Sequence, residues 1–443
     1  MDESKELYLS TPPGKLFRKA ALPGAISMLA GTLFSLIDGI FIGQILGDLA
    51  FTAASLAIPF TIVNFALAEL IGTGSSVPIS ICLGKGENNK ADNYFSCACI
   101  LIVLTGILMG VILYFGAESI MGFLGADGEL QYMAADYLKV YAICSPVTTM
   151  TFAVDNYLRI CGKNKMSMLL NILNYGLNIV LDFIFLFVLR LPVWSAALAT
   201  CISMMASTLI GIFPFVLRRF GLHFCRPQFS KEVFRQIIAS GSPTFLNNIS
   251  GRLASIVMNM ALLHMGGSSA VTVYGVMMYC GDIVIPLLMG VCDTVQPAIG
   301  YNYGAKRIDR VKEIEKYILI TAAGISVIAT VLMLSIPKIF ASMFLQAEEL
   351  ELLGAAARVI CIYALTFVTR WFGFAIQSFF TAIDKPVLAT ILSAGNACVI
   401  PLMLIALLWN MGLDGLWLNS PLTSLLISIV AGFLVVREWQ MGA

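Results

Sequence analysis

Charged residues are scarce in this sequence. Asp, Glu, Lys and Arg together make up 12% of the 443 residues, whereas soluble domains carry about 25%. Hydrophobic residues make up 59%. Apolar segments long enough to cross a bilayer take up nearly the whole length, so no sizeable soluble domain fits. We therefore expect a polytopic membrane protein.

Motifs of catalysis and of nucleotide hydrolysis are missing as well. The sequence holds no Walker loop of the form GxxxxGK[ST], no HExxH, no GxSxG and no Cys or His cluster with metal spacing. Its two His, His223 and His264, fall in loops or at helix ends, so neither is expected to relay protons within the membrane. These absences argue against an enzyme and against ATP as the energy source. Coupling to an ion gradient is the option left for a pump.

A strong net charge is also missing. The formal net charge is +1, whereas a nucleic-acid surface needs a concentrated basic face. We therefore expect no nucleic-acid partner.

Twelve apolar segments are of spanning length, and all are expected to be helical. They run roughly over residues 16–43, 51–80, 93–117, 131–159, 165–189, 192–217, 233–264, 270–299, 313–342, 352–381, 387–409 and 414–436.

Lys and Arg lie unevenly at the two ends of these segments. One side collects 21 of the 27, while the other has only Arg190, Lys338 and Arg358. The positive-inside rule makes the first side cytoplasmic. We therefore expect a multi-pass protein of the cell membrane with both termini in the cytoplasm.

The two halves of the chain repeat each other weakly. Shifted by 220, Pro23 falls on Pro243 and Gly84 falls on Gly304, and shifted by 223, Thr200 falls on Thr423. Six helices per half give both halves the same orientation, related by an axis along the membrane normal. The sequence thus predicts an all-α fold of twelve transmembrane helices in two six-helix lobes with pseudo-two-fold symmetry. The expected boundaries are an N-lobe at 1–217, a cytoplasmic linker at 218–232 and a C-lobe at 233–443.

Asp38 is the most unexpected residue of the first span. An Asp at the centre of a lipid-facing helix costs about 2.5–3.5 kcal/mol on insertion, so such an acid usually faces the bundle interior and marks an ion or substrate path. The alternative is a structural carboxylate that is hydrogen-bonded inside the bundle. Pro23, earlier in the same span, gives the helix a place to bend.

The fifth and sixth spans hold further oxygen donors. Asn178 and Asp182 are four residues apart and lie on one helical face, and Thr200 follows in the next span. Hard monovalent cations prefer such oxygens, and the same cluster with Asp38 could instead hold a proton. The alternative is that Asn178 and Asp182 join helices by hydrogen bonds.

Other charged residues in the spans can be explained by a structural role as well as by a functional one. Glu69 either lines a cavity of the N-lobe or caps a bend, and Asp155 with Arg159 fits a local ion pair. In the second half, Asp282 and Asp293 are expected to form compensating pairs with Arg252 and Arg370. The alternative is that these residues contact substrate, with Arg370 lining the cavity.

Two methionines are candidates for lining a cavity that repacks around varied organic molecules, although most Met here fill helix contacts. They are Met204 and Met258, and Met258 is the counterpart of Asp38. No acid lies in residues 240–263 or 361–380. We therefore expect the cation-binding acids in the first half alone.

Several motifs carry a family resemblance that covers essentially the whole chain. They are Asp38-Gly39-Ile40-Phe41-Ile42-Gly43, Leu83-Gly84-Lys85-Gly86, Leu158-Arg159-Ile160-Cys161-Gly162-Lys163 and Gln296-Pro297-Ala298-Ile299-Gly300-Tyr301-Asn302-Tyr303-Gly304-Ala305. In order and spacing the chain resembles multidrug and toxic compound extrusion (MATE) transporters, nearest the bacterial, MepA-like multidrug-efflux branch.

The resemblance implies an antiporter that expels organic, often cationic, compounds in exchange for sodium ions or protons. It implies a cation or proton site at Asp38, Asn178, Asp182 and Thr200, a first helix that bends at Pro23, and no cofactor besides the coupling ion. Some relatives also use acids of the seventh and tenth helices, which this chain lacks.

We expect small organic substrates, contact with membrane lipid and a monomeric protein. The alternative within the same superfamily fold is a flippase for lipids or lipid-linked glycans. Such a flippase is expected to gather basic residues for phosphates inside its cavity. In this chain, the only basic residues well inside the predicted spans are Lys139, Arg252 and Arg370.

Overall fold

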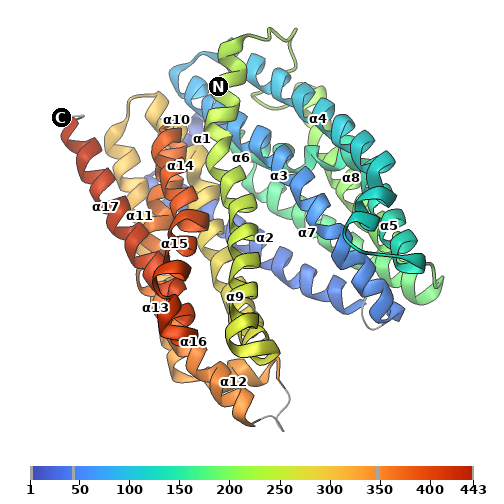
Figure 1. Ribbon diagram of the computed structural model, residues 1–443. Coiled ribbons are helices and arrows are strands. Elements are labelled where there is room, and N and C mark those ends of the chain that lie inside the picture. Colours follow the sequence, from blue (N-terminus) through green and yellow to red (C-terminus); the bar gives the residue numbers. More distant parts are fainter. Residues whose placement is uncertain (1–2, 42–44, 346–349, 442–443) are drawn as a thin grey trace. The chain divides into compact units, whose positions relative to one another are not determined.

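The structure is a computed structural model that describes residues 3–41, 45–345 and 350–441. All regular secondary structure in these ranges is helical (Figure 1). The α-helices are α1 (Glu3–Ser10), α2 (Pro13–Phe41), α3 (Asp48–Lys85), α4 (Asn88–Phe123), α5 (Gly128–Thr148), α6 (Met150–Ile160), α7 (Asn164–Asp182), α8 (Trp194–Val216), α9 (Lys231–Cys292), α10 (Gln296–Gly304), α11 (Ile308–Ser335), α12 (Pro337–Ser342), α13 (Leu350–Ala382), α14 (Pro386–Ala394), α15 (Ile400–Leu407), α16 (Gly412–Trp417) and α17 (Asn419–Met441). Two π-helical turns, Phe183–Val188 and Gly395–Val399, follow α7 and α14, and two 3-10 turns lie at Asp293–Val295 and Trp409–Met411.

The helices account for the twelve predicted spans. Nine stretches of the described chain are long and apolar enough to cross a membrane, and the stretch Lys231–Gly304 holds two predicted spans. Helix α2 carries the first span, and α5 with α6 carries the fourth. The prediction of an all-helical polytopic protein is therefore confirmed.

The helix α9 bends sharply at Gly267, where the seventh span passes into the eighth. The residue has a φ of 65° and a ψ of −160°, a combination that is open essentially only to glycine. Its repeat partner Gly47, before α3, has a φ of 83° and a ψ of −179°. The same backbone break thus recurs in both halves of the chain, as the repeat predicts.

Contacts divide the chain into two compact units. Unit 1 holds Met1–Pro12, Ile26–Gly241 and Gly300–Lys306, and unit 2 holds Pro13–Ala25, Ser242–Ile299 and Arg307–Ala443. The first part of α2 thus groups with unit 2, and the first part of α9 groups with unit 1. The units and the predicted lobes are therefore different divisions of the chain.

Helix ends cross closely within unit 1. A Cβ atom added at Gly84 of α3 would lie 2.1 Å from the carbonyl oxygen of Tyr301, and one at Gly304 of α10 would lie 2.2 Å from that of Ile81. Gly84 and Gly304 are repeat partners, as are Ile81 and Tyr301. The two contacts are therefore symmetric copies of one another, and both depend on the absence of a side chain.

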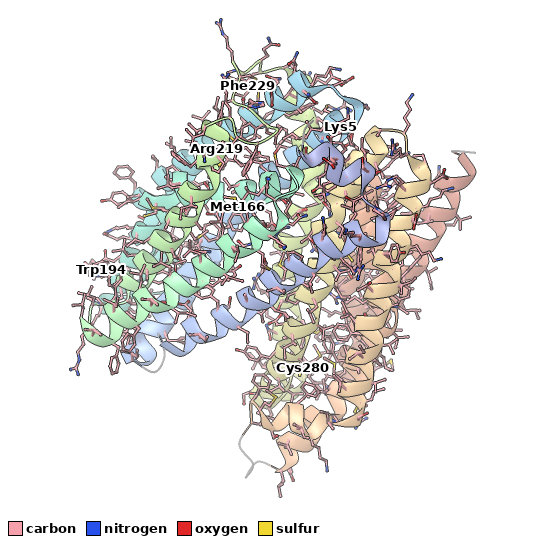
Figure 2. All side chains as sticks on the ribbon, turned by 180° about the vertical axis from the view of Figure 1, so that it is seen from behind. Lys5, Met166, Trp194, Arg219, Phe229 and Cys280 are labelled. Atoms are coloured by element: carbon pink, nitrogen blue, oxygen red, sulfur yellow. The ribbon has the colours of Figure 1, made fainter. Side chains whose placement is uncertain are left out.

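The short helix α1 is anchored in unit 1 by Tyr8, which is 1% exposed. Its hydroxyl donates to the carbonyl oxygen of Arg159, and Asn302 Nδ2 donates to the Tyr8 carbonyl oxygen at 3.1 Å. The rings of Tyr8 and Tyr301 lie 5.3 Å apart. Helix α1, on which Figure 2 labels Lys5, was not predicted from the sequence.

We predict that Gly84→Ala destabilises the protein by about 1–3 kcal/mol, because the added methyl group cannot fit against the Tyr301 carbonyl group. Thermal unfolding of the purified protein measures the effect. Gly324→Ala in α11 is the matched control, because a Cβ atom there meets nothing within 4 Å. Equal unfolding temperatures for the two variants would show that the crossing tolerates a side chain.

Candidate functional site

Four predicted residues from three helices lie together in unit 1. Asn178 and Asp182 of α7 are buried, with exposed fractions of 1% and 0%, and Asp38 of α2 and Thr200 of α8 are partly buried. Asn178 lies between Asp182 and Thr200. With the amide nitrogen turned toward the carboxylate, Asn178 donates to Asp182 Oδ2 at 2.7 Å and accepts from the hydroxyl group of Thr200 at 2.9 Å. This orientation satisfies both ends of the amide.

The carboxyl groups of Asp38 and Asp182 face each other. They lie within hydrogen-bonding range and interact electrostatically. The other oxygen of each group, Oδ1, is buried and has no hydrogen-bond partner. Two carboxylates at this range repel each other unless a proton or a cation lies between them. As two carboxylates, the pair thus carries a repulsion that one positive charge between them would remove.

Two tyrosines of α5 complete the cluster, and the sequence analysis missed them. Tyr137 and Tyr141 are 3% and 8% exposed, with ring centroids 5.5 Å apart. The Tyr141 hydroxyl group is hydrogen-bonded to Thr200, and both tyrosines lie within electrostatic range of Asp38. Their spacing of four residues in a span was the available signal, but aromatic pairs are common in apolar helices.

Local helix geometry positions the cluster. The α-helix α7 ends at Asp182, and the π-helical turn Phe183–Val188 follows directly; such turns recur at functional sites. The chain then reverses through Arg190, which has a φ of 51°. Trp194, labelled in Figure 2, begins α8 and places Thr200 almost two turns into that helix, opposite Asn178.

Alanine-rich faces bring the surrounding helices close. A buried cluster contains Ala53 and Ala57 of α3, Ala134 of α5, and Ala197 with Cys201 of α8. Tyr137 and Tyr141 belong to the same cluster. Small side chains permit close helix packing in membranes, so α3, α5 and α8 can approach each other closely around the polar groups.

The remaining predicted residues divide between the units. Glu69 of α3 is half-buried and Met204 of α8 is 6% exposed, both in unit 1. Met258 of α9 is 5% exposed and Arg370 of α13 is half-buried, both in unit 2. Pro23 lies within α2, in the part that belongs to unit 2.

The predicted ion pair between Asp155 and Arg159 is confirmed. Asn171 Nδ2 donates to Asp155 Oδ1 at 3.1 Å, and Arg159 Nε donates to Ser167 Oγ at 3.3 Å. The pair therefore belongs to a local network of α6 and α7.

The two acids Asp282, in α9, and Asp293, in the turn after it, have different partners. Asp282 lies within electrostatic range of Arg252, as the compensating-pair prediction requires. Asp293 instead accepts a hydrogen bond from Gln296 Nε2 at 2.9 Å. Arg370 keeps a buried Nε atom without a hydrogen-bond partner.

Known proteins are similar to this chain in sequence and in fold. The MatE family model matches it twice, over residues 23–184 and 243–407. The multidrug export protein MepA of Staphylococcus aureus (strain MSSA476) is 27% identical over 413 residues, which cover 91% of this chain and 89% of MepA. MepA of Staphylococcus saprophyticus is 28% identical over 427 residues, which cover 94% and 93%.

Solved structures agree over almost the full length. A MATE crystal structure in complex with MaL6 matches with a TM-score of 0.92 at 24% identity, covering 99% of this chain and 98% of the other. A MOP superfamily transporter from Pyrococcus furiosus matches with a TM-score of 0.91 at 24% identity, covering 98% and 97%.

The two matches to the family model begin at positions that differ by the same shift as the two halves of the sequence. The first match begins at Pro23 and the second at Pro243, and these two prolines are the repeat partners found in the sequence. This chain belongs to the MatE family and is a multi-pass membrane protein with the two-lobe, twelve-helix MATE fold.

Proposed function

We propose that this protein is a secondary active antiporter that exports organic, cationic compounds in exchange for sodium ions or protons by alternating access. The observation that carries the proposal is the facing pair of carboxyl groups, Asp38 and Asp182, in a buried oxygen cluster. The name of the relatives, multidrug export protein, supports export of varied small molecules.

The cluster suits one hard monovalent cation or one proton. The buried Oδ1 atoms of Asp38 and Asp182 are free to accept it, and the hydroxyl groups of Thr200, Tyr137 and Tyr141 lie around the pair. Sodium prefers such oxygen donors. The described residues hold no group of three or more His, Cys, Asp or Glu that fits a metal ion.

Repulsion between the two carboxylates supplies the coupling energy. Two negative charges about 4 Å apart repel by about 4 kcal/mol at an effective dielectric constant of about 20. A bound cation removes this repulsion and holds α2 against α7. Loss of the cation favours a conformation in which the two acids separate. Only such a difference in affinity between conformations can drive the exchange of ion for drug.

Pro23 gives α2 a place to respond to the charge of Asp38. A proline inside a helix removes one backbone hydrogen bond and weakens that turn. Asp38 lies further along the same helix, near its end. We infer that occupation of the Asp38 site changes the bend at Pro23.

The substrate side is proposed from composition and burial. Met204 and Met258 offer adaptable apolar surface, and Glu69 offers a negative charge that suits an organic cation. We further propose that the protein acts as a monomer, contacts membrane lipid and keeps both termini in the cytoplasm.

Arg370 favours the alternative of a lipid or lipid-linked glycan flippase. Its Nε atom is buried without a hydrogen-bond partner, and a guanidinium group binds phosphate well. A single such group is a weak match for a phosphate-lined cavity, so export of organic cations remains the preferred function.

The gradient that drives transport is identified in proteoliposomes loaded with a fluorescent organic cation. A sodium gradient and a proton gradient are imposed in separate experiments. We expect at least one of them to drive efflux, because the carboxyl pair can hold either ion. Empty liposomes are the control. Movement of a fluorescent lipid without efflux of the cation would replace the proposal with the flippase function.

We predict that Asp38→Asn lowers gradient-driven efflux about tenfold or more, because the neutral amide no longer repels Asp182 when the site is empty. Asp127→Asn is the matched control, since Asp127 is exposed and its side chain makes no cap hydrogen bond. Equal amounts of protein in the vesicles are confirmed by fluorescence detection. Full efflux by Asp38→Asn would remove Asp38 from the coupling site.

The hydroxyl group of Thr200 offers a finer test. Thr200→Val keeps the shape but leaves Asn178 without one hydrogen bond, which costs about 1–2 kcal/mol. We expect the half-saturating concentration of the coupling ion to rise about tenfold. Thr200→Ser restores the hydroxyl group and should restore the affinity. Unchanged ion affinity in the valine variant would contradict a role for Thr200.

A further inference from the structure

Glu315 of α11 is a buried acid in unit 2 that the proposed transport site does not use. The residue is 8% exposed. Both of its carboxyl oxygens, Oε1 and Oε2, are buried and have no hydrogen-bond partner. The neighbouring Glu313 and Lys316 are exposed, so of these three charged residues Glu315 alone turns toward the interior.

The internal repeat shows what the fold itself requires at this position. Helices α4 and α11 begin at the repeat partners Asn88 and Ile308, and the same shift makes Phe95 the counterpart of Glu315. Phe95 is fully buried, and its ring packs 5.0 Å from that of Tyr157 and 4.7 Å from that of Phe224. The fold therefore uses this helix position for apolar packing in one half and places a carboxyl group there in the other.

Polar groups of α9 and the following turn lie close to Glu315. The buried thiol group of Cys292, at the end of α9, is within electrostatic range of both Glu315 and Asp293. Asp293 is held by Gln296, whose Nε2 atom is also 2.9 Å from Ser378 Oγ of α13. In the described residues, no Lys, Arg or His lies within ion-pair distance of Glu315. Cys292 and Asp293 are thus the titratable groups at the end of α9 near Glu315, and on α11 itself Lys312, one turn before Glu315, is exposed.

The charged form of such a carboxyl group is very unfavourable. An ionised carboxylate buried without a hydrogen bond or a partner charge keeps the full cost of its desolvation. A carboxylic acid carries no charge and avoids that cost. The same region lacks a third acid or imidazole that would complete a metal site among the described residues.

We propose that Glu315 is a second protonation site of this protein, in unit 2, and that its ligand in the conformation described here is a proton. Release of that proton requires Glu315 to reach water or a cation. The protonation of Glu315 is therefore linked to conformation. This assignment concerns the folded protein alone and does not depend on the transport proposed for Asp38.

The test compares Glu315→Gln with Glu313→Gln, the same substitution two residues away on the exposed face of α11. Above about pH 5 an unfolded Glu is ionised, whereas the folded protein keeps Glu315 protonated. The wild type then loses stability as pH rises, and Glu315→Gln does not. We expect Glu315→Gln to unfold about 1–3 °C above the wild type at about pH 9, with no such gain at about pH 5. Glu313→Gln should unfold at the same temperature as the wild type at both pH values.

Infrared spectroscopy of the purified protein gives a second, direct readout. Glu315→Gln should lose one carboxylic-acid carbonyl band that the wild type and Glu313→Gln retain. If the glutamine variant does not fold, Glu315→Leu replaces it, because Phe95 shows that an apolar side chain fits this position. An unchanged infrared band together with a parallel pH dependence would overturn the proposal, and neither readout uses transport.

Discussion

Burial of negative charge in an apolar helical bundle is the constraint on which this structure depends. Asp38 and Asp182 share one small cluster, and Glu315 lies buried in the other unit without a partner. Each carboxyl group must be neutralised by a proton, a cation or a hydrogen-bond donor. Asp155 meets the same requirement by pairing with Arg159, whereas the proposed sites at Asp38, Asp182 and Glu315 have no basic partner of this kind among the described ion pairs.

Close helix packing is what makes such burial possible. Alanines of α3, α5 and α8 support the tyrosines around Asp38, and glycines at repeat-related positions bring α3 and α10 into contact. Without the hydrophobic effect between helices in lipid, contact distance and backbone approach carry more of the stability. Small residues therefore fix the positions of the polar side chains, although they make no polar contact themselves.

The sequence predicted elements with a strong physical signal and missed those without one. Twelve spans followed from hydropathy, and Asn178 with Asp182 followed from their spacing on one helical face. Tyr137 and Tyr141 were missed because a tyrosine in a span resembles ordinary packing. The inward orientation of Glu315, beside the exposed Glu313 and Lys316, could not be predicted near a helix end that is rich in charge. The position of α1 depends on tertiary contacts that no local pattern encodes.

The anchoring of α1 has a consequence for the order of events during synthesis. Asn302, which donates a hydrogen bond to the carbonyl group of Tyr8, leaves the ribosome 294 residues after Tyr8. At about 5–20 residues per second, this delay is about 15–60 s. Helix α1 thus meets its partner Arg159 well before Asn302 is made, and its contacts are completed only after residues 26–241 of unit 1 have been synthesised.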